Sequence, residues 1–292
     1  MPQVKEGHVE FKAENAPPCS TFYKIIGDLS NGKTPIVALH GGPGVNHEYL
    51  LVLADITEAQ GNALILYDQM GSGKSTHYPD KMGDTSFWTE DLFLNQLDNV
   101  LENLGIQNDY VLCGHSWGGM LASRHAAPAD MQLWVTAQNR LRAQLPEAVQ
   151  DVLTKHEDEG TTDSAEYQTA VGAFYARFLC TMDPMPSEVS AALGEIAKDP
   201  NCIFDNTTER NGPSEFHITG PLAKWSILND AEKICVPTLL INGRLDEAQD
   251  DTMRPFFEKI GKVKWVKFAE SSHMAHHEER ERFMLEVGLF LE

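Results

Sequence analysis

Residues 114–118 form a G-x-S-x-G pattern, Gly114-His115-Ser116-Trp117-Gly118. An apolar run at 110–113 precedes the pattern, and a helix-compatible run at 120–122 follows it. Alone, the pattern also fits a small-residue turn with a buried serine. In this context it predicts a sharp strand-to-helix turn that projects the serine hydroxyl away from a sheet, with glycines where side chains would clash. We therefore expect Ser116 to be a nucleophile at the N-terminus of a helix.

A glycine-rich segment, His40-Gly41-Gly42-Pro43-Gly44, follows the strand-like run 35–39. A loop of this type after a strand can offer a backbone N–H to a carbonyl oxygen under attack. We assign this donor to Gly42 and expect the N–H of Trp117 to be its partner. Alone, the segment would be an ordinary Gly/Pro turn. Together with Ser116 it predicts an oxyanion hole.

A serine nucleophile needs a base, and the base needs an orienting carboxylate. Residues 236–243 predict a strand and turn, and Asp246 follows them. Residues 263–268 alternate as a strand does, and His273 follows that strand by a short loop. In a parallel sheet these strand ends face the same way as Ser116. We therefore predict that Ser116, Asp246 and His273 form a catalytic triad.

Strand-like and helix-like segments alternate along most of the chain, which predicts a mostly parallel sheet flanked by helices. Helical periodicity dominates from 131 to 228. We therefore expect a core of residues 1–130 and 229–292 with an inserted helical cap at 131–228. The expected strands are an antiparallel hairpin at 9–12 and 21–26, then 35–39, 63–67, 110–113, 236–241 and 263–268; helices are expected near 48–60, 88–104, 117–127, 251–260 and 277–291.

The segment after the Ser116 helix departs from this alternation. No β-rich run lies between residues 124 and 145, where the fold would normally place another parallel strand. A βα step needs roughly 10–12 residues, so it cannot fit into residues 128–130. We expect one core strand to be missing, with its neighbours left unpaired or forced together.

Two further histidines compete with His273 for the role of base. His276 and His277 come three and four residues later. We interpret both as the exposed start of the last helix, Glu278 to Leu291.

Six motifs together narrow the assignment: HGGPG (40–44), DQMGSGKS (68–75), GHSWGG (114–119), NGPSEF (211–216), GRLDEA (243–248) and SSHM (271–274). As a set they resemble the proline iminopeptidase family of α/β-hydrolases, which also includes L-amino-acid amidases. The resemblance covers the chain from about residue 20 to its end. It implies an α/β-hydrolase fold and the triad predicted above, with no cofactor and no metal.

The resemblance also implies that Glu215 and Glu247 hold the free α-ammonium of the substrate. Carboxylates in a partly desolvated pocket bind such a cation through charge-assisted hydrogen bonds. Without the resemblance, Glu215 would be a loop charge and Glu247 an acidic residue at a helix start. The implied substrate is a small peptide or amino-acid amide with a free N-terminus.

The expected activity is a serine hydrolase that releases an N-terminal residue, proline or another, through an acyl-enzyme. Two alternatives stay open. The first is an esterase or lactonase that uses the same triad. The second is a catalytically impaired, non-enzymatic variant, because of the missing strand.

Composition sets the expected partners and location. The 292 residues carry a formal net charge of −20, which would repel nucleic acid and anionic membranes. The sequence contains no apolar run of membrane-spanning length and does not start with a secretory signal. The five cysteines lack C-x-x-C and zinc spacing, so we expect a reducing, cytoplasmic setting, with Cys113 and Cys235 as buried thiols.

Overall fold

The computed structural model describes residues 2–12, 17–81, 84, 86–126, 131–198, 214, 216 and 231–292. Contacts divide the chain into two units. Unit 1 consists of Met1–His125, Ser187–Asp205 and Val287–Glu292. Unit 2 consists of Ala126–Pro186 and Asn206–Glu286. Each unit contains a sheet of its own.

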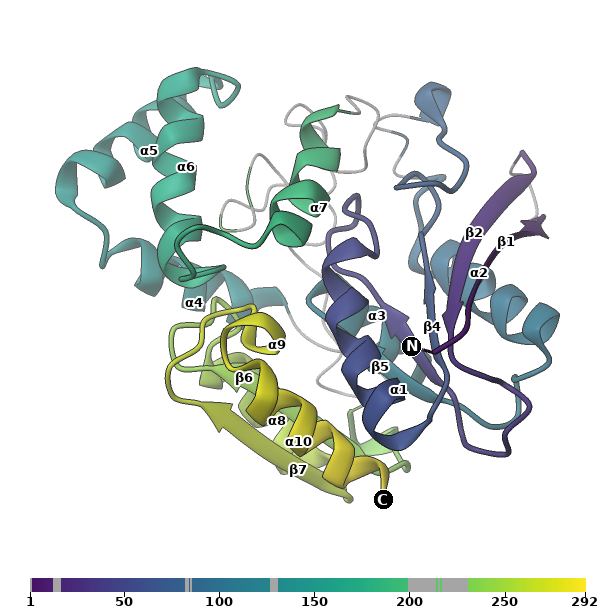
Figure 1. The fold of residues 1–292 in the computed structure, drawn as a ribbon. Coiled ribbons are helices and arrows are strands. Elements are labelled where there is room, and N and C mark those ends of the chain that lie inside the picture. Colours follow the sequence, from purple (N-terminus) through teal and green to yellow (C-terminus); the bar gives the residue numbers. More distant parts are fainter. Residues whose placement is uncertain are drawn as a thin grey trace. The chain divides into compact units, whose positions relative to one another are not determined.

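The sheet of unit 1 has the strand order β1-β2-β4-β3-β5 (Figure 1). Strand β2 is antiparallel to β1 and β4, and β3 is parallel to β4 and β5. Every residue of β3 and β4 is buried, as expected for continuous apolar runs inside a parallel sheet. The strands are β1 (Val4–Phe11), β2 (Cys19–Ile26), β3 (Ile36–Leu39), β4 (Leu64–Tyr67) and β5 (Val111–Gly114).

The predicted helix ranges 48–60, 88–104 and 117–127 all contain helices of unit 1. The longest, α2, begins at Thr89, whose hydroxyl accepts the N–H of Leu92 at 3.3 Å. It ends at Gly105, which adopts a left-handed conformation with φ 72°. The helices are η1 (Glu48–Leu53), α1 (Ala54–Gln60), η2 (Pro79–Lys81), α2 (Glu90–Leu104), α3 (Trp117–Ala126) and α7 (Ser187–Lys198).

Unit 2 combines helices with a parallel pair of strands, β6 and β7, in which Thr238 pairs with Val263. Helix α5 packs beside α6 around buried side chains that include Leu153, Tyr167 and Phe174 (Figure 1). The elements of unit 2 are α4 (Met131–Arg142), α5 (Glu147–Glu159), α6 (Ala165–Phe178), η4 (Ala231–Lys233), β6 (Thr238–Gly243), α8 (Asp250–Lys259), β7 (Val263–Phe268), α9 (Ala275–Glu278) and most of α10 (Arg280–Leu291). The described part of 131–198 is thus helical, and its role as a cap stays a prediction.

Strand β5 forms one edge of its sheet. Within the described residues no strand lies between α3 and α4, and β5 pairs only with β3. The side chains at 111–113 are partly exposed and Gly114 is exposed, although β3 and β4 are fully buried. These observations agree with the predicted loss of a strand after the Ser116 helix.

Two sequence-based predictions about exposure are wrong. His276 is buried, at 2% exposure, because its ring packs against Phe283 at a centroid distance of 5.8 Å. The predicted last helix is divided into α9 and α10. Of the two histidines, His277 is partly exposed and His276 is not. Cys235 is exposed because it lies in the loop between η4 and β6, and Cys113 is only partly buried.

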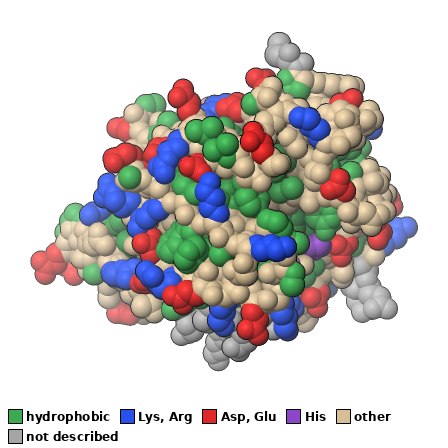
Figure 2. All heavy atoms as spheres, turned by 90° about the horizontal axis from the view of Figure 1, so that it is seen from below, with side chains coloured by type: hydrophobic (Ala, Val, Ile, Leu, Met, Phe, Trp, Pro, Cys, Tyr) green, Lys and Arg blue, Asp and Glu red, His purple; other side chains and the backbone are tan. Residues whose placement is uncertain are grey.

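The surface carries charges of both signs. On the face drawn in Figure 2, lysine and arginine side chains lie among the aspartates and glutamates, and apolar side chains also reach the surface. The acidic excess therefore does not form one uniform patch on that face. None of the helices in the described ranges has the length and hydrophobicity needed to cross a membrane.

Candidate active site

Ser116 lies on the turn between β5 and α3 with a backbone φ of 54°, a left-handed value that is rare outside glycine. A Cβ on Gly114 would overlap the carbonyl of Gly118, and a Cβ on Gly118 would overlap that of Leu39. Only glycine fits these two positions. The predicted strand-to-helix turn is therefore confirmed, whereas the nucleophilic role of Ser116 stays a prediction.

Trp117 is the first residue of α3, so its N–H has no carbonyl in its own helix to bond. The turn before it is closed by a hydrogen bond from the N–H of Gly118 to the carbonyl of His115, at 2.8 Å. The helix dipole adds positive potential at this end of α3. The backbone N–H of Trp117 is thus suited to stabilise an oxyanion beside Ser116.

The glycine-rich loop at 40–44 follows β3 and lies beside the serine turn. A Cβ on Gly41 would lie 3.0 Å from Cβ of Ser116. The N–H of Gly41 donates to the hydroxyl of Tyr49 at 2.7 Å, and Gly42 has a positive φ of 105°. Both predicted oxyanion donors, Gly42 and Trp117, therefore belong to segments that flank Ser116.

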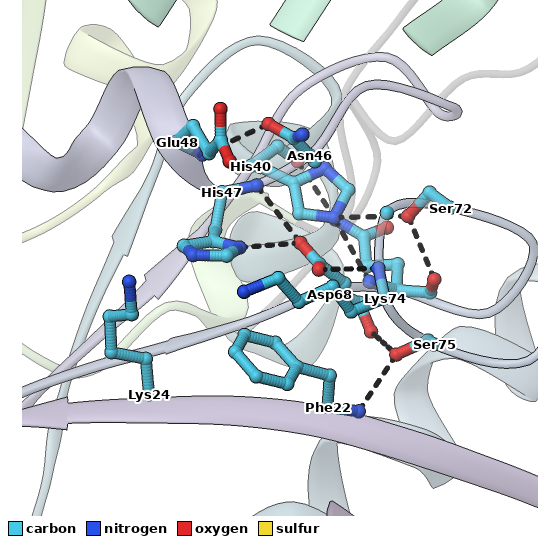
Figure 3. Close-up of polar contacts among 12 residues, drawn as sticks. Phe22, Lys24, His40, Asn46, His47, Glu48, Asp68, Ser72, Lys74 and Ser75 are labelled. Carbon is cyan, nitrogen blue, oxygen red and sulfur yellow. Dashed lines mark hydrogen bonds and ion pairs between the residues drawn. The ribbon is translucent and has the colours of Figure 1, made fainter. Parts of the chain in front are cut away.

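A buried carboxylate, Asp68, ties this loop region together (Figure 3). It accepts hydrogen bonds from the ring of His47 at 2.7 Å, from the His47 N–H at 3.0 Å and from the Lys74 N–H at 2.8 Å. A Cβ on Gly73 would overlap the carboxylate, so the loop needs glycine there. Burial alone would raise the pKa of Asp68, but the hydrogen bond and the charge of His47 lower it below its usual range. The Asp68 carboxylate therefore stays ionised between His47 and the backbone of Lys74.

In unit 2, Asp246 follows β6 and His273 follows β7. Nδ1 of His273 lies 2.7 Å from Oδ1 of Asp246, and both side chains are buried. The carboxylate also accepts the backbone N–H groups of Ala248 at 2.7 Å and Gly243 at 3.1 Å. The loops approach closely because Gly243 has no side chain to overlap the carbonyls of the serines before His273. The structure thus pairs the predicted acid with the predicted base.

Glu247 is fully buried beside this pair, at 0% exposure. Its carboxylate lies 3.5 Å from Nε2 of His273, and its backbone carbonyl accepts from Gln138 at 2.9 Å. Burying a carboxylate is costly unless a charge or hydrogen bond compensates it. Its position is therefore not that of a solvated acid at a helix start. Glu215, the other predicted ammonium ligand, lies outside the described residues.

The predicted site residues divide between the units. Ser116, Gly42 and Trp117 belong to unit 1, and Asp246, Glu247 and His273 belong to unit 2. The described ranges contain no cluster of three or more His, Cys, Asp or Glu side chains suited to a metal ion. The contacts of the 68–75 motif were not predicted from the sequence. The pattern DQMGSGKS was the available signal, but its partners are far away in the sequence.

Comparison with known proteins defines the class. A family description of the α/β hydrolase fold matches residues 34–280, which is most of the chain. The parallel strands and the glycine-flanked serine turn agree with that fold. The protein is an α/β hydrolase.

More specific relatives define the family. The proline iminopeptidase of Saccharolobus solfataricus is 32% identical over 285 residues, with 93% of this chain and 87% of the relative covered. The crystal structure of VinJ is 43% identical with a TM-score of 0.92 and covers 100% of this chain and 99% of its own. The crystal structure of the Mycobacterium smegmatis proline iminopeptidase is 33% identical with a TM-score of 0.84, covering 98% and 97%. The chain belongs to the proline iminopeptidase family and is a peptidase-type hydrolase.

Proposed function

We propose that this hydrolase releases the N-terminal residue from small peptides or amino-acid amides by way of an acyl-enzyme. The observation that carries the proposal is the turn at Ser116, where a positive φ and obligatory glycines present a serine at a helix N-terminus. Family membership supports the same chemistry. The buried pair of Asp246 and His273 supports it further, because it supplies an oriented base.

In the acylation step, Oγ of Ser116 attacks the carbonyl carbon of the N-terminal residue while Nε2 of His273 takes the hydroxyl proton. The C–O bond forms and the carbonyl oxygen becomes an oxyanion, stabilised by the N–H groups of Gly42 and Trp117. Asp246 stabilises the imidazolium. The C–N bond then breaks, and His273 gives its proton to the leaving amine.

In the deacylation step, water takes the place of the leaving amine. His273 removes a proton from the water, whose oxygen attacks the ester carbonyl of acylated Ser116. The same two N–H donors stabilise the second oxyanion. Collapse of the intermediate returns the proton to Ser116 and releases the free amino acid.

Substrate selection rests on Glu215 and Glu247. In a substrate with a free N-terminus the α-ammonium is one bond from the α-carbon beside the scissile carbonyl. A buried carboxylate beside the catalytic base is therefore well suited to hold it. The 3.5 Å between Glu247 and Nε2 of His273 supports this role for Glu247. The assignment of Glu215 rests on its place in the motif NGPSEF.

The experiment that tests the proposal compares wild type with Ser116→Ala. Wild type should hydrolyse aminoacyl-naphthylamides and amino-acid amides, and a fluorophosphonate should label it. Ser116→Ala should lose labelling and lose at least about 10⁴-fold in kcat, because triad members act as one unit. Substantial activity in purified Ser116→Ala would overturn the assignment. Much faster hydrolysis of a simple ester than of any aminoacyl substrate would favour an esterase.

A second candidate is a chain that folds without turning over substrate. The half-exposed edge strand β5, which carries the Ser116 turn, favours it. Circular dichroism together with fluorophosphonate labelling distinguishes the two candidates. A folded protein that is not labelled fits the second candidate, and a folded, labelled protein fits the first.

A further inference from the structure

We propose that Gln69 is a positioning residue that fixes the two oxyanion donors relative to each other. This inference rests on the proposed function, since it takes Gly42 and Trp117 as those donors. The side-chain amide of Gln69 lies between their two segments. Its Nε2 donates to the carbonyl of His40 at 2.8 Å, and its Oε1 accepts from Nε1 of Trp117 at 2.9 Å.

A third hydrogen bond fixes the backbone of Gln69 to the same loop. Its N–H donates to Nε2 of His40 at 2.9 Å. Nδ1 of His40 in turn lies 2.8 Å from the carbonyl of Gly41. Nε2 can accept only while the imidazole is neutral with its proton on Nδ1, which then donates to Gly41. Gln69 and His40 together therefore hold the strand end that leads into Gly42.

The environment makes these bonds strong constraints. The exposed fractions are 0% for Gln69, 0% for His40 and 3% for Trp117, so water does not compete for the amide. A buried polar group that loses its partner costs far more than a solvated one. Asp68, the residue before Gln69, fixes the 68–75 segment through its hydrogen bonds with His47 and Lys74 (Figure 3). Gln69 is thus held by hydrogen bonds at its backbone N–H, at Nε2 and at Oε1.

Glutamine is the side chain that this position requires. It offers a donor and an acceptor on one planar group, which a carboxylate or an alkyl chain cannot do. The donor faces the oxyanion loop and the acceptor faces the indole of Trp117. The backbone N–H of that tryptophan is the other proposed oxyanion donor. A shift of about 1 Å in a catalytic group can cost about 10²-fold in rate. Gln69 therefore affects kcat by positioning the two oxyanion donors, without contacting the substrate.

The test uses Gln69→Met, Trp117→Phe and the double variant, with Gln96→Met as a matched control. Gln96 is equally buried, and its amide also makes two bonds, accepting from the Met70 N–H at 3.0 Å and donating to Thr21 at 2.9 Å. Neither bond reaches the oxyanion loop or Trp117. Gln96→Met should therefore lower Tm and leave kcat per fluorophosphonate-labelled site unchanged.

Gln69→Met and Trp117→Phe should each lower kcat per labelled site by about 10- to 100-fold with little change in KM. Each should also weaken binding of an aminoacyl boronic acid by a similar factor, because its serine adduct is a tetrahedral anion that places an oxygen at the oxyanion donors. The double variant should lose little more than the worse single variant, because both changes break the same bond between Gln69 and Trp117.

A Gln69→Met enzyme with lowered Tm but wild-type kcat per labelled site would overturn the inference, since that is the behaviour of the control. If Gln69→Met does not fold, Trp117→Phe decides alone, because it removes the Nε1–H donor and leaves Gln69 in place. A wild-type kcat there overturns the proposal. Failure of wild type itself to be labelled or to hydrolyse any substrate would instead refute the proposed function.

Discussion

His273 directs Nδ1 at Asp246, with 2.7 Å between Nδ1 and Oδ1. The carboxylate is already fixed by two backbone N–H groups of its own turn, from Gly243 and Ala248. Its orientation is therefore fixed by β6 and the turn after it. Once Nδ1 donates to Asp246, Nε2 is the nitrogen left to exchange protons, as the proposed base requires.

Replacing His273 by alanine should lower kcat about as much as replacing Ser116, by roughly 10⁴-fold or more, since the serine loses its base. His277→Ala should be mild because that side chain is partly exposed. Steady-state kinetics on one aminoacyl-naphthylamide, with enzyme concentration taken from absorbance, measures both effects.

His276→Ala is the informative control for that experiment. The side chain is buried against Phe283, so its loss should lower Tm. The folded fraction should still turn over near the wild-type rate. A lethal His276→Ala together with an active His273→Ala would show that the base had been assigned to the wrong histidine.

Blocking the α-amino group of the substrate should cost more than changing the first side chain. N-acetylation removes the cation that Glu215 and Glu247 are proposed to bind. An uncompensated buried charge costs about 3–5 kcal/mol, so kcat/KM should fall by roughly 10²–10³-fold or more. The measurement is kcat/KM for the free and the N-acetylated form of one aminoacyl amide.

The variant for that comparison is Glu215→Gln. It should weaken hydrolysis of the free-amine substrate and barely change that of a small neutral ester, because the triad is untouched. Equal rates of wild type on the free and acetylated amides would rule out an aminopeptidase-type site. The esterase alternative would then be favoured.

Much of this architecture is readable from the sequence because its signals are local. Continuous apolar runs mark β3 and β4, alternation marks β7, and glycine spacing marks the Ser116 turn. The expectation that a strand is missing after the Ser116 helix also comes from chain length, since too few residues separate α3 from α4 to form a βα step. The exception among the strands is β1, which extends back to Val4 through exposed residues that no apolar pattern marks.

The missed features depend on contacts between distant residues. The bond between Trp117 and Gln69 spans 48 positions, and the bond between His47 and Asp68 spans 21. Such pairs leave no periodic pattern in the sequence, so the contacts of the 68–75 motif could not be predicted from it. The burial of His276 has a different origin, because it depends on the break between α9 and α10 and on the packing of Phe283 against the His276 ring.

Replacement by alanine should have opposite effects at a tightly packed glycine, Gly118, and at an open helical glycine, Gly172. A Cβ on Gly118 would overlap the carbonyl of Leu39, so Gly118→Ala should distort the serine turn and abolish fluorophosphonate labelling. Gly172 lies inside α6 with nothing within 4 Å of the added carbon. Gly172→Ala should stabilise the protein by about 0.5–1 kcal/mol and keep full labelling. Urea unfolding and labelling of both variants check this; a fully labelled Gly118→Ala would contradict it.

His40 should make stability depend on pH. Burial lowers its pKa below the usual range, although the charge of Asp68 favours the proton and that of His47 opposes it. Below about pH 6.5 the unfolded chain therefore binds a proton that the folded protein excludes. Since stability rises with pH wherever the unfolded state binds more protons, this contribution is present above about pH 6.5. It is lost as pH falls towards the folded pKa, by at most about 1.4 kcal/mol per pH unit.

Urea unfolding between pH 7.5 and 5 measures this contribution. His40→Gln should flatten the slope of the unfolding free energy against pH relative to wild type. NMR of the wild-type His40 ring provides a second measurement that does not depend on the variant folding. The ring should stay neutral to a lower pH than an ordinary histidine does, because Nε2 accepts the Gln69 N–H and a second ring proton would face that donor. A His40 ring that becomes protonated in the folded protein at the usual pH for histidine would refute the prediction.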